Sequence, residues 1–484
     1  MSLDERYAAV NSALESVGQT HVLKHYASLN DADKEALLSE CEGIDWPEVA
    51  RLIGSHVKQK PEFALSDDIQ PAPWYPHVPD TDELKTKYAE ARSLGEKLVG
   101  EGKVAAFTVA GGQGTRLGWD GPKGTFPATP VRGATLFACF AEYLHKVKEK
   151  FGGVVPWYVM TSPINDAATR AFFEHNKYFG LNPADVMIFP QAMMPAIDMD
   201  SHKVLLETPS SLALSPNGHG GSLKALWTSG AIADMKKRGV EQISYTQVDN
   251  PTVRMIDPLF IGLHAMDVAQ MSSKMLPKAY PKEKLGNFCI ADGKMTVIEY
   301  SNLPDELAEQ RLDNGELRFR AGSIALHCIR ADFVESINTA PEGFSLPFNR
   351  AEKKVAFLDE ASGQTVIPES ANAVKLETFV FDALPMCDAS IIYETDRVDE
   401  FAPIKNADTP EGEADAGDSP ASSKKLQTER AARWLEANGV EIARDTDGVV
   451  DAVIEIKQTT AIYPEDLKAI EFPGAVRSGD KLLF

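Results

Sequence analysis

Residues 103–124, KVAAFTVAGGQGTRLGWDGPKG, carry the pattern that decides the fold of this chain. The segment VAAFTVA is a short apolar run, which predicts a buried β-strand. Glycines at 111, 112, 114 and 118 follow directly, and glycines let a backbone approach a ligand closely and point successive N–H groups at it. Arg116 and Lys123 add positive charge within reach of the same space. Together these features predict a cradle for a polyphosphate at the end of the first strand.

The spacing of this loop differs from two better-known glycine-rich phosphate loops. A P-loop reads GxxxxGK followed by Ser or Thr, whereas Lys123 follows Pro122 outside such a frame. The dinucleotide fingerprint reads GxGxxG and opens a helix, whereas Gly112, Gly114 and Gly118 give GxGxxxG. The sequence therefore disfavours both a P-loop NTPase and an NAD enzyme.

Downstream of the loop, short apolar runs alternate with longer amphipathic segments. The expected strands are 104–110, 156–162, 186–191 and 242–249, and the expected helices are 134–150, 166–176 and 222–239. This alternation predicts an α/β fold whose central sheet is mixed, mostly parallel and flanked by helices. A hairpin around Asp292 and Gly293 predicts an inserted antiparallel piece.

The chain is expected to divide into four regions. Residues 1–100 form an N-terminal helical region, because apolar residues recur at helical spacing in DERYAAVNSALESVG and DADKEALLSECEGI. Residues 101–408 form the α/β domain, which would be the catalytic domain. Residues 409–425 are rich in Asp, Glu, Ser, Pro and Gly, which predicts an acidic linker. Residues 426–484 form a small C-terminal α+β domain.

Charge and cysteine content narrow the class of protein. The 49 Lys and Arg residues against 71 Asp and Glu give a net charge of −22, which argues against a nucleic-acid partner, because such proteins need a basic face. The 5 cysteines are scattered with no CxxC pair, which excludes a zinc ribbon and favours a reducing cytoplasm. Neither a secretory signal nor a membrane span is expected. The oligomeric state is left open.

The glycine loop, AGGQGTRLG followed by PKG, resembles the signature of the sugar-1-phosphate nucleotidylyltransferases. In particular, the chain resembles the eukaryotic-type UDP-N-acetylhexosamine pyrophosphorylases. Further segments agree in the family's order, over roughly residues 100–410: FPQAMMPA, SPNGHGGSLKAL, VDNPTVRMIDPLFIG, IEYS, AGSIALH, KLETFVFD and EFAPIKNAD. The resemblance implies a nucleotidyltransferase (Rossmann-like) sheet and a uridylyltransferase that makes UDP-sugar and pyrophosphate from UTP and a sugar 1-phosphate, with Mg²⁺.

Roles for the phosphate-binding residues follow from this resemblance and from side-chain chemistry. Arg116 would hold the β- and γ-phosphates of UTP, because its planar fork suits phosphate oxygens, and Lys123 would place charge near the α-phosphate. Lys405 would reach the phosphate of the sugar. Asp249, at the carboxyl edge of a strand, would be the Mg²⁺ ligand. The residues expected to hold the nucleotide are Gly111, Gly112, Gly114, Thr115, Gln191, Pro216 and Gly218, of which Gln191 and the segment 216–218 face the uracil.

The expected sugar pocket agrees with the family at some positions and departs from it at others. Hexosamine members have Asn where this chain has His219 and Ser323, and the Gly-His-Gly run is similar to that of UDP-glucose pyrophosphorylases. A neutral, hydrogen-bonding His219 is favoured over a catalytic one. The positions that match are Gly286, Glu299, Phe379 and Phe381. The balance favours an N-acetylhexosamine 1-phosphate, with glucose 1-phosphate and a non-catalytic UDP-sugar-binding protein as alternatives.

Overall fold

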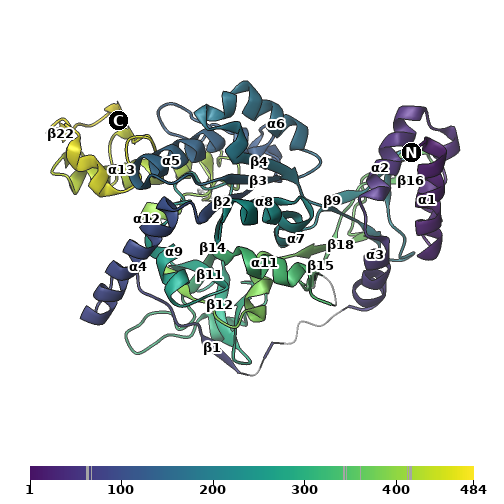
Figure 1. The fold of residues 1–484 in the computed structure, drawn as a ribbon, viewed down its shortest axis with the longest axis horizontal. Coiled ribbons are helices and arrows are strands. Elements are labelled where there is room, and N and C mark those ends of the chain that lie inside the picture. Colours follow the sequence, from purple (N-terminus) through teal and green to yellow (C-terminus); the bar gives the residue numbers. More distant parts are fainter. Residues whose placement is uncertain are drawn as a thin grey trace. The chain divides into compact units, whose positions relative to one another are not determined.

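The computed structural model describes residues 1–60, 65–66, 68–341, 344, 346–359, 361–410, 412–413 and 417–484. Its ribbon is drawn in Figure 1. The chain forms two compact units, of which unit 1 comprises residues 1–65, 191–225 and 345–382, and unit 2 the rest. The predicted boundaries at 101, 409 and 426 stay predictions. The expected acidic linker falls partly outside the described residues, at 411 and 414–416.

Unit 2 is built on a ten-stranded mixed sheet, and the predicted α/β class is confirmed. The main path runs β1-β12-β14-β10-β2-β3-β4, with β11, β13 and β19 paired to its members. Strands β10, β2, β3 and β4 are parallel neighbours, while β14 runs antiparallel to β10. The strands are β1 (Ile69–Pro71), β2 (Val104–Val109), β3 (Trp157–Thr161), β4 (Val186–Pro190), β10 (Gln242–Gln247), β11 (Met271–Pro277), β12 (Gly286–Ala291), β13 (Lys294–Ile298), β14 (Ala321–Arg330) and β19 (Ile392–Glu394).

Helix α5 (Leu136–Phe151) shows why the predicted helices form. The hydroxyl of Thr135 accepts a hydrogen bond from the N–H of Ala138, which caps the start of the helix. Phe137 and other apolar residues of one face are buried against Trp157 of β3. Gly152 then takes a left-handed φ of 81°, which ends the helix. Figure 1 shows α5 and α6 beside β3 and β4.

The other helices of unit 2 close the layers around the sheet. Helix α4 packs on α9 closely enough that Gly95 and Gly262 leave no room for a side chain: a Cβ would lie 1.8 and 1.7 Å from backbone oxygens. The helices are α4 (Asp82–Gly100), α6 (Asp166–His175), α8 (Ala231–Arg238), α9 (Pro258–Met266), α10 (Asp305–Ala308), α11 (Ala331–Asn338), α12 (Arg397–Glu400) and α13 (Pro420–Glu436). No described helix is both long and apolar enough to cross a membrane.

Two details of unit 2 test the sequence-based expectations. The predicted helix over 222–239 is interrupted between α7 (Gly221–Thr228) and α8, because Gly230 adopts a left-handed φ of 82°. The predicted hairpin is confirmed: β12 and β13 pair antiparallel across Asp292 and Gly293, whose φ values are 50° and 74°. Positive φ at both central residues is what a type I′ hairpin turn requires.

The C-terminal part of unit 2 has a small core of its own. Helix α13 contributes Ala431, Trp434 and Leu435 to this core, with Ile454 and Leu467 from the segment that follows. Within the apolar run 448–460, the strand is confined to β21, which pairs parallel with β23. The strands here are β20 (Glu441–Ile442), β21 (Val453–Glu455), β22 (Ala475–Val476) and β23 (Lys481–Leu483).

Unit 1 combines the N-terminal helices with small antiparallel sheets. Its core includes Leu37, Trp46, Leu52, Val374 and Leu376, so helices and strands share one hydrophobic cluster. Strand β18 pairs with β15 and β6. The elements are α1 (Leu3–Ser16), α2 (Asp31–Glu42), α3 (Trp46–Leu52), β5 (Met193–Pro195), β6 (Ile197–Asp198), β7 (Leu206–Thr208), β8 (Ser211–Leu212), β9 (Leu214–Pro216), β15 (Phe348–Lys353), β16 (Phe357–Asp359), β17 (Gln364–Val366) and β18 (Ala373–Thr378).

Candidate functional site

The glycine loop and Asp249 lie at the point where the strand order of the parallel sheet reverses. Strand β2 has β3 on one side, the next strand in sequence, and β10 on the other. In open α/β sheets, ligands bind outside the carboxyl ends of the strands at such a reversal, so the loops after β2 and β10 are the expected binding region. The loop after β2 carries the glycines from 111 to 124, and Asp249 is the second residue after the end of β10.

The carbonyl oxygens of the glycine loop are held by buried side chains. Asn165 donates through Nδ2 to the carbonyls of Ala110, at 2.9 Å, and Gly112, at 3.2 Å. The Ser162 hydroxyl donates to the carbonyl of Gly111 at 2.9 Å. Both side chains belong to fully buried residues. Asn165 occupies the N-cap position of α6 yet makes no capping bond; its amide fixes the loop instead.

The N–H groups of the same loop are left available. Within the described part of the chain, no acceptor is hydrogen-bonded to the backbone N–H of Gly111, Gly112 or Gln113. Because the carbonyls are tied back, successive amides present a concentrated partial positive charge that suits an anion. The free N–H groups are compatible with the predicted cradle, which stays a prediction.

Two glycines of the loop are required for different reasons. At Gly114 a Cβ would lie 2.7 Å from Cβ of Trp119, so packing within the protein demands glycine. At Gly112 a Cβ would meet nothing within 4 Å, and φ is not positive. Neither packing nor backbone conformation requires glycine at 112, which is compatible with the predicted close approach of a ligand.

Two of the residues expected at the phosphates, Lys123 and Asp249, contact the backbone of Ile404. Lys123 donates through Nζ to the carbonyl of Ile404 at 3.4 Å, and the N–H of Ile404 donates to the carbonyl of Asp249 at 2.8 Å. Lys405 is the next residue; its ammonium lies 3.6 Å from Asp418 and 5.5 Å from the ring centre of Phe401. The structure thus brings Lys123, Asp249 and Lys405 together.

Arg116 and Thr115 form the exposed rim of the loop, in the short turn Thr115–Leu117. In the described structure the Arg116 guanidinium makes no hydrogen bond and no ion pair. A free arginine at the edge of an amide cradle can bind phosphate oxygens in a bidentate manner.

Asp249 fits a magnesium ion that is shared with substrate phosphates. Its carboxylate is half-buried and without a hydrogen-bond or ion-pair partner among the described residues. Across those residues, no group of three or more His, Cys, Asp or Glu side chains could hold a metal ion. These residues therefore do not provide a metal site made of protein ligands alone. Mg²⁺ at phosphate sites is commonly held by one or two carboxylates together with substrate oxygens.

The three sugar-pocket candidates of unit 2 lie next to one another. Gly286 of β12 is registered opposite Ser323 of β14. A Cβ on Gly286 would lie 2.6 Å from Val297 and 3.4 Å from Oε1 of Glu299. Burial raises the pKa of Glu299, and none of the described side chains pairs with its carboxylate. A half-buried, unpaired carboxylate is a suitable acceptor for two hydroxyl groups.

His219, Phe379 and Phe381 form an aromatic cluster in unit 1. The His219 ring stacks on Phe379 with centroids 5.2 Å apart and lies 5.5 Å from Phe381. Nδ1 of His219 accepts a hydrogen bond from the N–H of Val380 at 3.1 Å, so the proton of the neutral ring is on Nε2. Burial lowers the pKa of His219 to about 4. The ring is therefore neutral near pH 7 and can donate one hydrogen bond.

The uracil candidates also belong to unit 1 and include two amide oxygens without partners. Gln191 and Asn217 are buried, and neither Gln191 Oε1 nor Asn217 Oδ1 has a described hydrogen-bond partner. Pro216 is registered opposite Met193. Gly218 has a φ of 61°, and a Cβ there would lie 2.3 Å from the carbonyl of Thr378. Buried acceptors without donors are costly and point to a ligand with donor groups.

Sequence reasoning missed the residues that hold these groups in place. Asn165 and Ser162, which fix the glycine loop, follow β3 rather than β2. Asn250 orients the start of the next loop: its Nδ2 donates to the carbonyl of Glu400 at 2.6 Å, and its Oδ1 accepts from Ala402 at 3.1 Å. The available signal was an Asn within a few residues of the end of each strand, at 165 after β3 and at 250 after β10.

Comparison with known proteins places this geometry in a family. The model of the UTP–glucose-1-phosphate uridylyltransferase family matches residues 54–410. The chain belongs to this family. It is 34% identical to UDP-N-acetylhexosamine pyrophosphorylase-like protein 1 of Xenopus tropicalis, over 96% of each chain. It is 33% identical to UDP-N-acetylglucosamine diphosphorylase 1 of Arabidopsis thaliana, over 97% of this chain and 92% of that protein.

A solved structure agrees with these sequence matches. The uridine diphosphate N-acetylglucosamine pyrophosphorylase of Trypanosoma brucei superposes with a TM-score of 0.81 at 25% identity, covering 98% of each chain. The predicted resemblance and the predicted enzyme class, a nucleotidyltransferase, are confirmed. The roles of individual site residues and the Mg²⁺ remain predictions.

Proposed function

We propose that this enzyme transfers the uridylyl group of UTP to an N-acetylhexosamine 1-phosphate and releases pyrophosphate. The observation that carries the proposal is the glycine loop, whose carbonyls are tied to Asn165 and Ser162 while the N–H groups of residues 111–113 have no acceptor among the described residues. Lys123 and Asp249 both contact the backbone of Ile404. Relatives that match almost the whole chain carry the name UDP-N-acetylglucosamine diphosphorylase or pyrophosphorylase, which supports the substrate class.

The reaction needs positioning and charge stabilisation more than a nucleophilic side chain. A phosphate oxygen of the sugar attacks the α-phosphorus of UTP in line with the leaving pyrophosphate, and negative charge grows on the leaving group. The loop amides and Arg116 would hold the β- and γ-phosphates. Lys123 and Lys405, gathered at Ile404, would offset the repulsion between the two anionic substrates.

Mg²⁺ would be held by Asp249 together with phosphate oxygens. When bound, the ion would neutralise phosphate charge and favour the in-line geometry. The carboxylate of Asp249 is free for this purpose, and its backbone is fixed through Ile404. We expect Asp249→Asn to raise the Mg²⁺ concentration needed for half-maximal rate by a larger factor than it raises the KM for UTP.

Base and sugar would be recognised by the unpartnered polar groups of the candidate sites. Gln191 offers an acceptor and a donor to the imide edge of uracil. Glu299 would accept bonds from sugar hydroxyls, and His219 Nε2 would donate one to the sugar. The Phe379 and Phe381 rings would pack against the N-acetyl group. His219 and Ser323 stand where hexosamine enzymes are expected to carry Asn, so glucose 1-phosphate is the second candidate substrate.

The enzyme is proposed to act in the cytoplasm. All five cysteines are free thiols and buried: Cys41, Cys139, Cys289, Cys328 and Cys387. Unpaired cysteines suit a reducing compartment. Burial raises the pKa of Cys41 and Cys289 to about 12, so these thiols are inert at neutral pH.

Initial rates of pyrophosphate release test the proposal. With UTP, Mg²⁺ and N-acetylglucosamine 1-phosphate, the wild-type chain should release pyrophosphate, and Lys123→Met should reduce kcat by at least tenfold while the fold is kept. Lys148→Met, on α5 in the same unit, is the matched control for loss of a lysine charge, because Lys148 is exposed and has no ion pair among the described residues. It should leave kcat unchanged. Tight UTP binding with no pyrophosphate from any sugar 1-phosphate would favour the non-catalytic alternative.

A further inference from the structure

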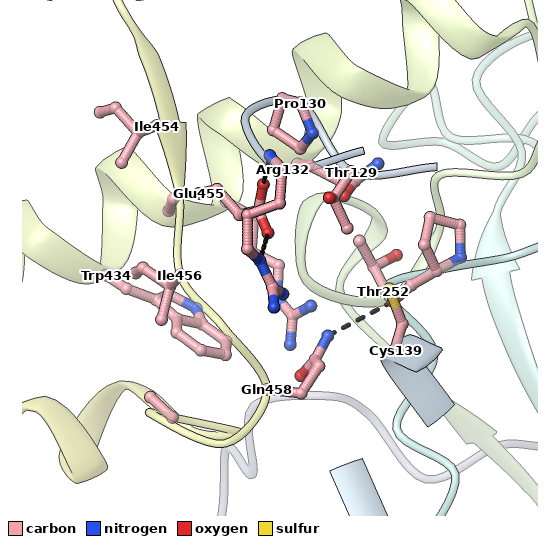
Figure 2. A pocket seen from close by; sticks show the side chains of 15 residues that line it. Thr129, Pro130, Arg132, Cys139, Thr252, Trp434, Ile454, Glu455, Ile456 and Gln458 are labelled. Carbon is pink, nitrogen blue, oxygen red and sulfur yellow. Dashed lines mark hydrogen bonds and ion pairs between the residues drawn. The ribbon is translucent and has the colours of Figure 1, made fainter. Parts of the chain in front are cut away.

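A small cavity lies in unit 2, between helix α13 and the segments 129–132 and 251–252. Its volume is about 30 Å³, and its walls come from the segment 129–132, the segment 251–252, helix α13 and residues 454–461. Figure 2 shows Trp434 and Ile456 on one side of it and Thr252 and Cys139 on the other. This is room for a few water molecules or one compact ion, and too little for a nucleotide.

Arg430 of α13 lines this cavity and lacks hydrogen-bond partners. The residue is only 6% exposed, and its Nε and Nη2 have no acceptor in the described structure. The guanidinium lies 4.3 Å from the ring centre of Trp434, which holds its plane in place without satisfying its N–H groups. Buried, unsatisfied donors on a cation are costly, so an acceptor is expected inside the cavity.

The neighbouring carboxylates are already engaged elsewhere. Glu455 accepts from the backbone N–H groups of Val131 and Arg132, both at 2.9 Å, and from Nε of Arg132 at 2.6 Å. These bonds outweigh burial, which by itself would raise its pKa, and keep the pKa of Glu455 below its ordinary value. Figure 2 shows this ion pair at the centre of the cavity wall.

The carboxylate of Asp399 is likewise engaged by other groups. It accepts from Nη2 of Arg254 at 2.8 Å and from the indole N–H of Trp434 at 3.2 Å. Burial lowers the pKa of Arg430 to about 10, which leaves it a cation at neutral pH. The cavity is therefore lined by a charged donor fork, while the carboxylates of Glu455 and Asp399 are used by other groups.

We propose that this cavity is a binding site for a compact tetrahedral oxyanion such as inorganic phosphate or sulfate, with Arg430 as its principal ligand. A planar guanidinium with two free donors matches two oxygens of such an ion. Gln458, whose Nε2 makes only a long bond of 3.4 Å to the carbonyl of Pro251, lies in the same wall and can turn its amide toward the ion.

The site would be connected to the loop that carries Asp249. Thr252 lines the cavity and donates from its hydroxyl to Oδ1 of Asn250 at 2.9 Å. Asn250 is the residue after Asp249, so an ion in the cavity would rigidify the segment 249–252 together with α13. The binding site itself does not depend on the proposed activity.

Thermal melting in phosphate tests the proposal without any substrate. The melting temperature is measured at matched ionic strength in sodium phosphate and in sodium chloride, for wild type, Arg430→Met and Arg433→Met. Arg433 lies on the same helix but pairs with Asp396 at the surface, so it is the matched control. Wild type and Arg433→Met should melt higher in phosphate, and titration should give an affinity at least tenfold weaker for Arg430→Met.

The melting temperature in sodium chloride distinguishes an arginine that binds an ion from an arginine with a structural role. If Arg430 binds an ion, Arg430→Met should melt in chloride at or above the wild-type temperature, because it removes a buried cation without partners. If its role is structural, the variant should melt lower in both salts by the same amount, which would overturn the proposal. Arg430→Lys, which keeps the charge but not the fork, serves if the Met variant fails to fold, and should show the same weakened phosphate response.

A further variant excludes binding in the glycine loop. Arg116→Met should keep the phosphate response, whereas a response lost in Arg116→Met and kept in Arg430→Met would place the ion at the nucleotide site and overturn the proposal. Crystals soaked in selenate give a direct answer. An anomalous peak within hydrogen-bond distance of Arg430 is expected, and a cavity that holds only water would contradict the assignment.

Discussion

The substitution Gly112→Ala separates ligand approach from protein packing as the reason for a glycine. The added Cβ would meet no protein atom within 4 Å, and φ is not positive. Replacing a glycine by alanine at a compatible backbone position stabilises the folded protein by about 0.4–1 kcal/mol, because the unfolded chain has less conformational freedom. We therefore expect the melting temperature of the variant to stay the same or rise slightly.

The effect on UTP binding should be large by comparison. A methyl group beside the free N–H of Gly112 would keep a phosphate oxygen out of hydrogen-bond range. One hydrogen bond to a charged group contributes about 1.5–3 kcal/mol, which corresponds to a rise of about 10- to 100-fold in KM for UTP at about 1.4 kcal/mol per tenfold. The KM for the sugar 1-phosphate should change less.

Gly114→Ala is the matched control two residues away. Its Cβ would lie 2.7 Å from Cβ of Trp119, so overpacking should destabilise the fold by about 1–3 kcal/mol. The assay measures initial rates of pyrophosphate release against UTP concentration, with thermal melts on the same samples. An unchanged KM for UTP in Gly112→Ala, with an intact fold, would refute the cradle.

Three further predictions concern buried groups around the site. Asn165→Ala should lower kcat/KM for UTP by about 10- to 100-fold, because the carbonyl of Ala110 loses its donor and that of Gly112 keeps only the N–H of Lys123; unchanged UTP kinetics would contradict the positioning role. Lys274→Met should lower the free energy of unfolding in urea by about 3–5 kcal/mol, because it leaves the carboxylates of Asp257 and Glu400, each 2.7 Å from Nζ, without their cation. A loss below about 1 kcal/mol would argue that this ion-pair cluster contributes nothing to stability. Because the pKa of His219 falls from 6.5 to about 4 on folding, its buried neutral form stabilises the protein above pH 6.5 and that contribution is lost as pH falls toward 4. His219→Asn should therefore reduce the loss of stability between pH 7 and pH 5, and an identical pH dependence in the variant would be evidence against a buried neutral ring.

The sequence predicted those parts of the fold whose causes are local. The run VAAFTVA and its glycines place a strand and a phosphate loop, because strand burial and glycine freedom are properties of neighbouring residues. The helix over 222–239 was predicted unbroken, since one glycine inside an amphipathic pattern does not reveal whether it takes a left-handed φ. At Gly230 it does, and two helices result.

The parts that could not be predicted depend on contacts between distant segments. Asn165 looks like a helix cap in the sequence, and only the adjacency of β2 and β3 shows that it holds the glycine loop. Arg430 lies in a helical stretch, LQTERAARWLEANG, where arginine is expected at the surface. Its burial without partners follows from how α13 packs on the loops 129–132 and 251–252.

A competition between two sugars tests the central claim most directly. The enzyme is given UTP, Mg²⁺ and equal concentrations of N-acetylglucosamine 1-phosphate and glucose 1-phosphate, and the UDP-sugars are separated by mass. The account predicts mainly UDP-N-acetylglucosamine, with pyrophosphate in equal amount. Mainly UDP-glucose would show that His219 and Ser323 set a different sugar preference, and no UDP-sugar at all would contradict the proposed activity.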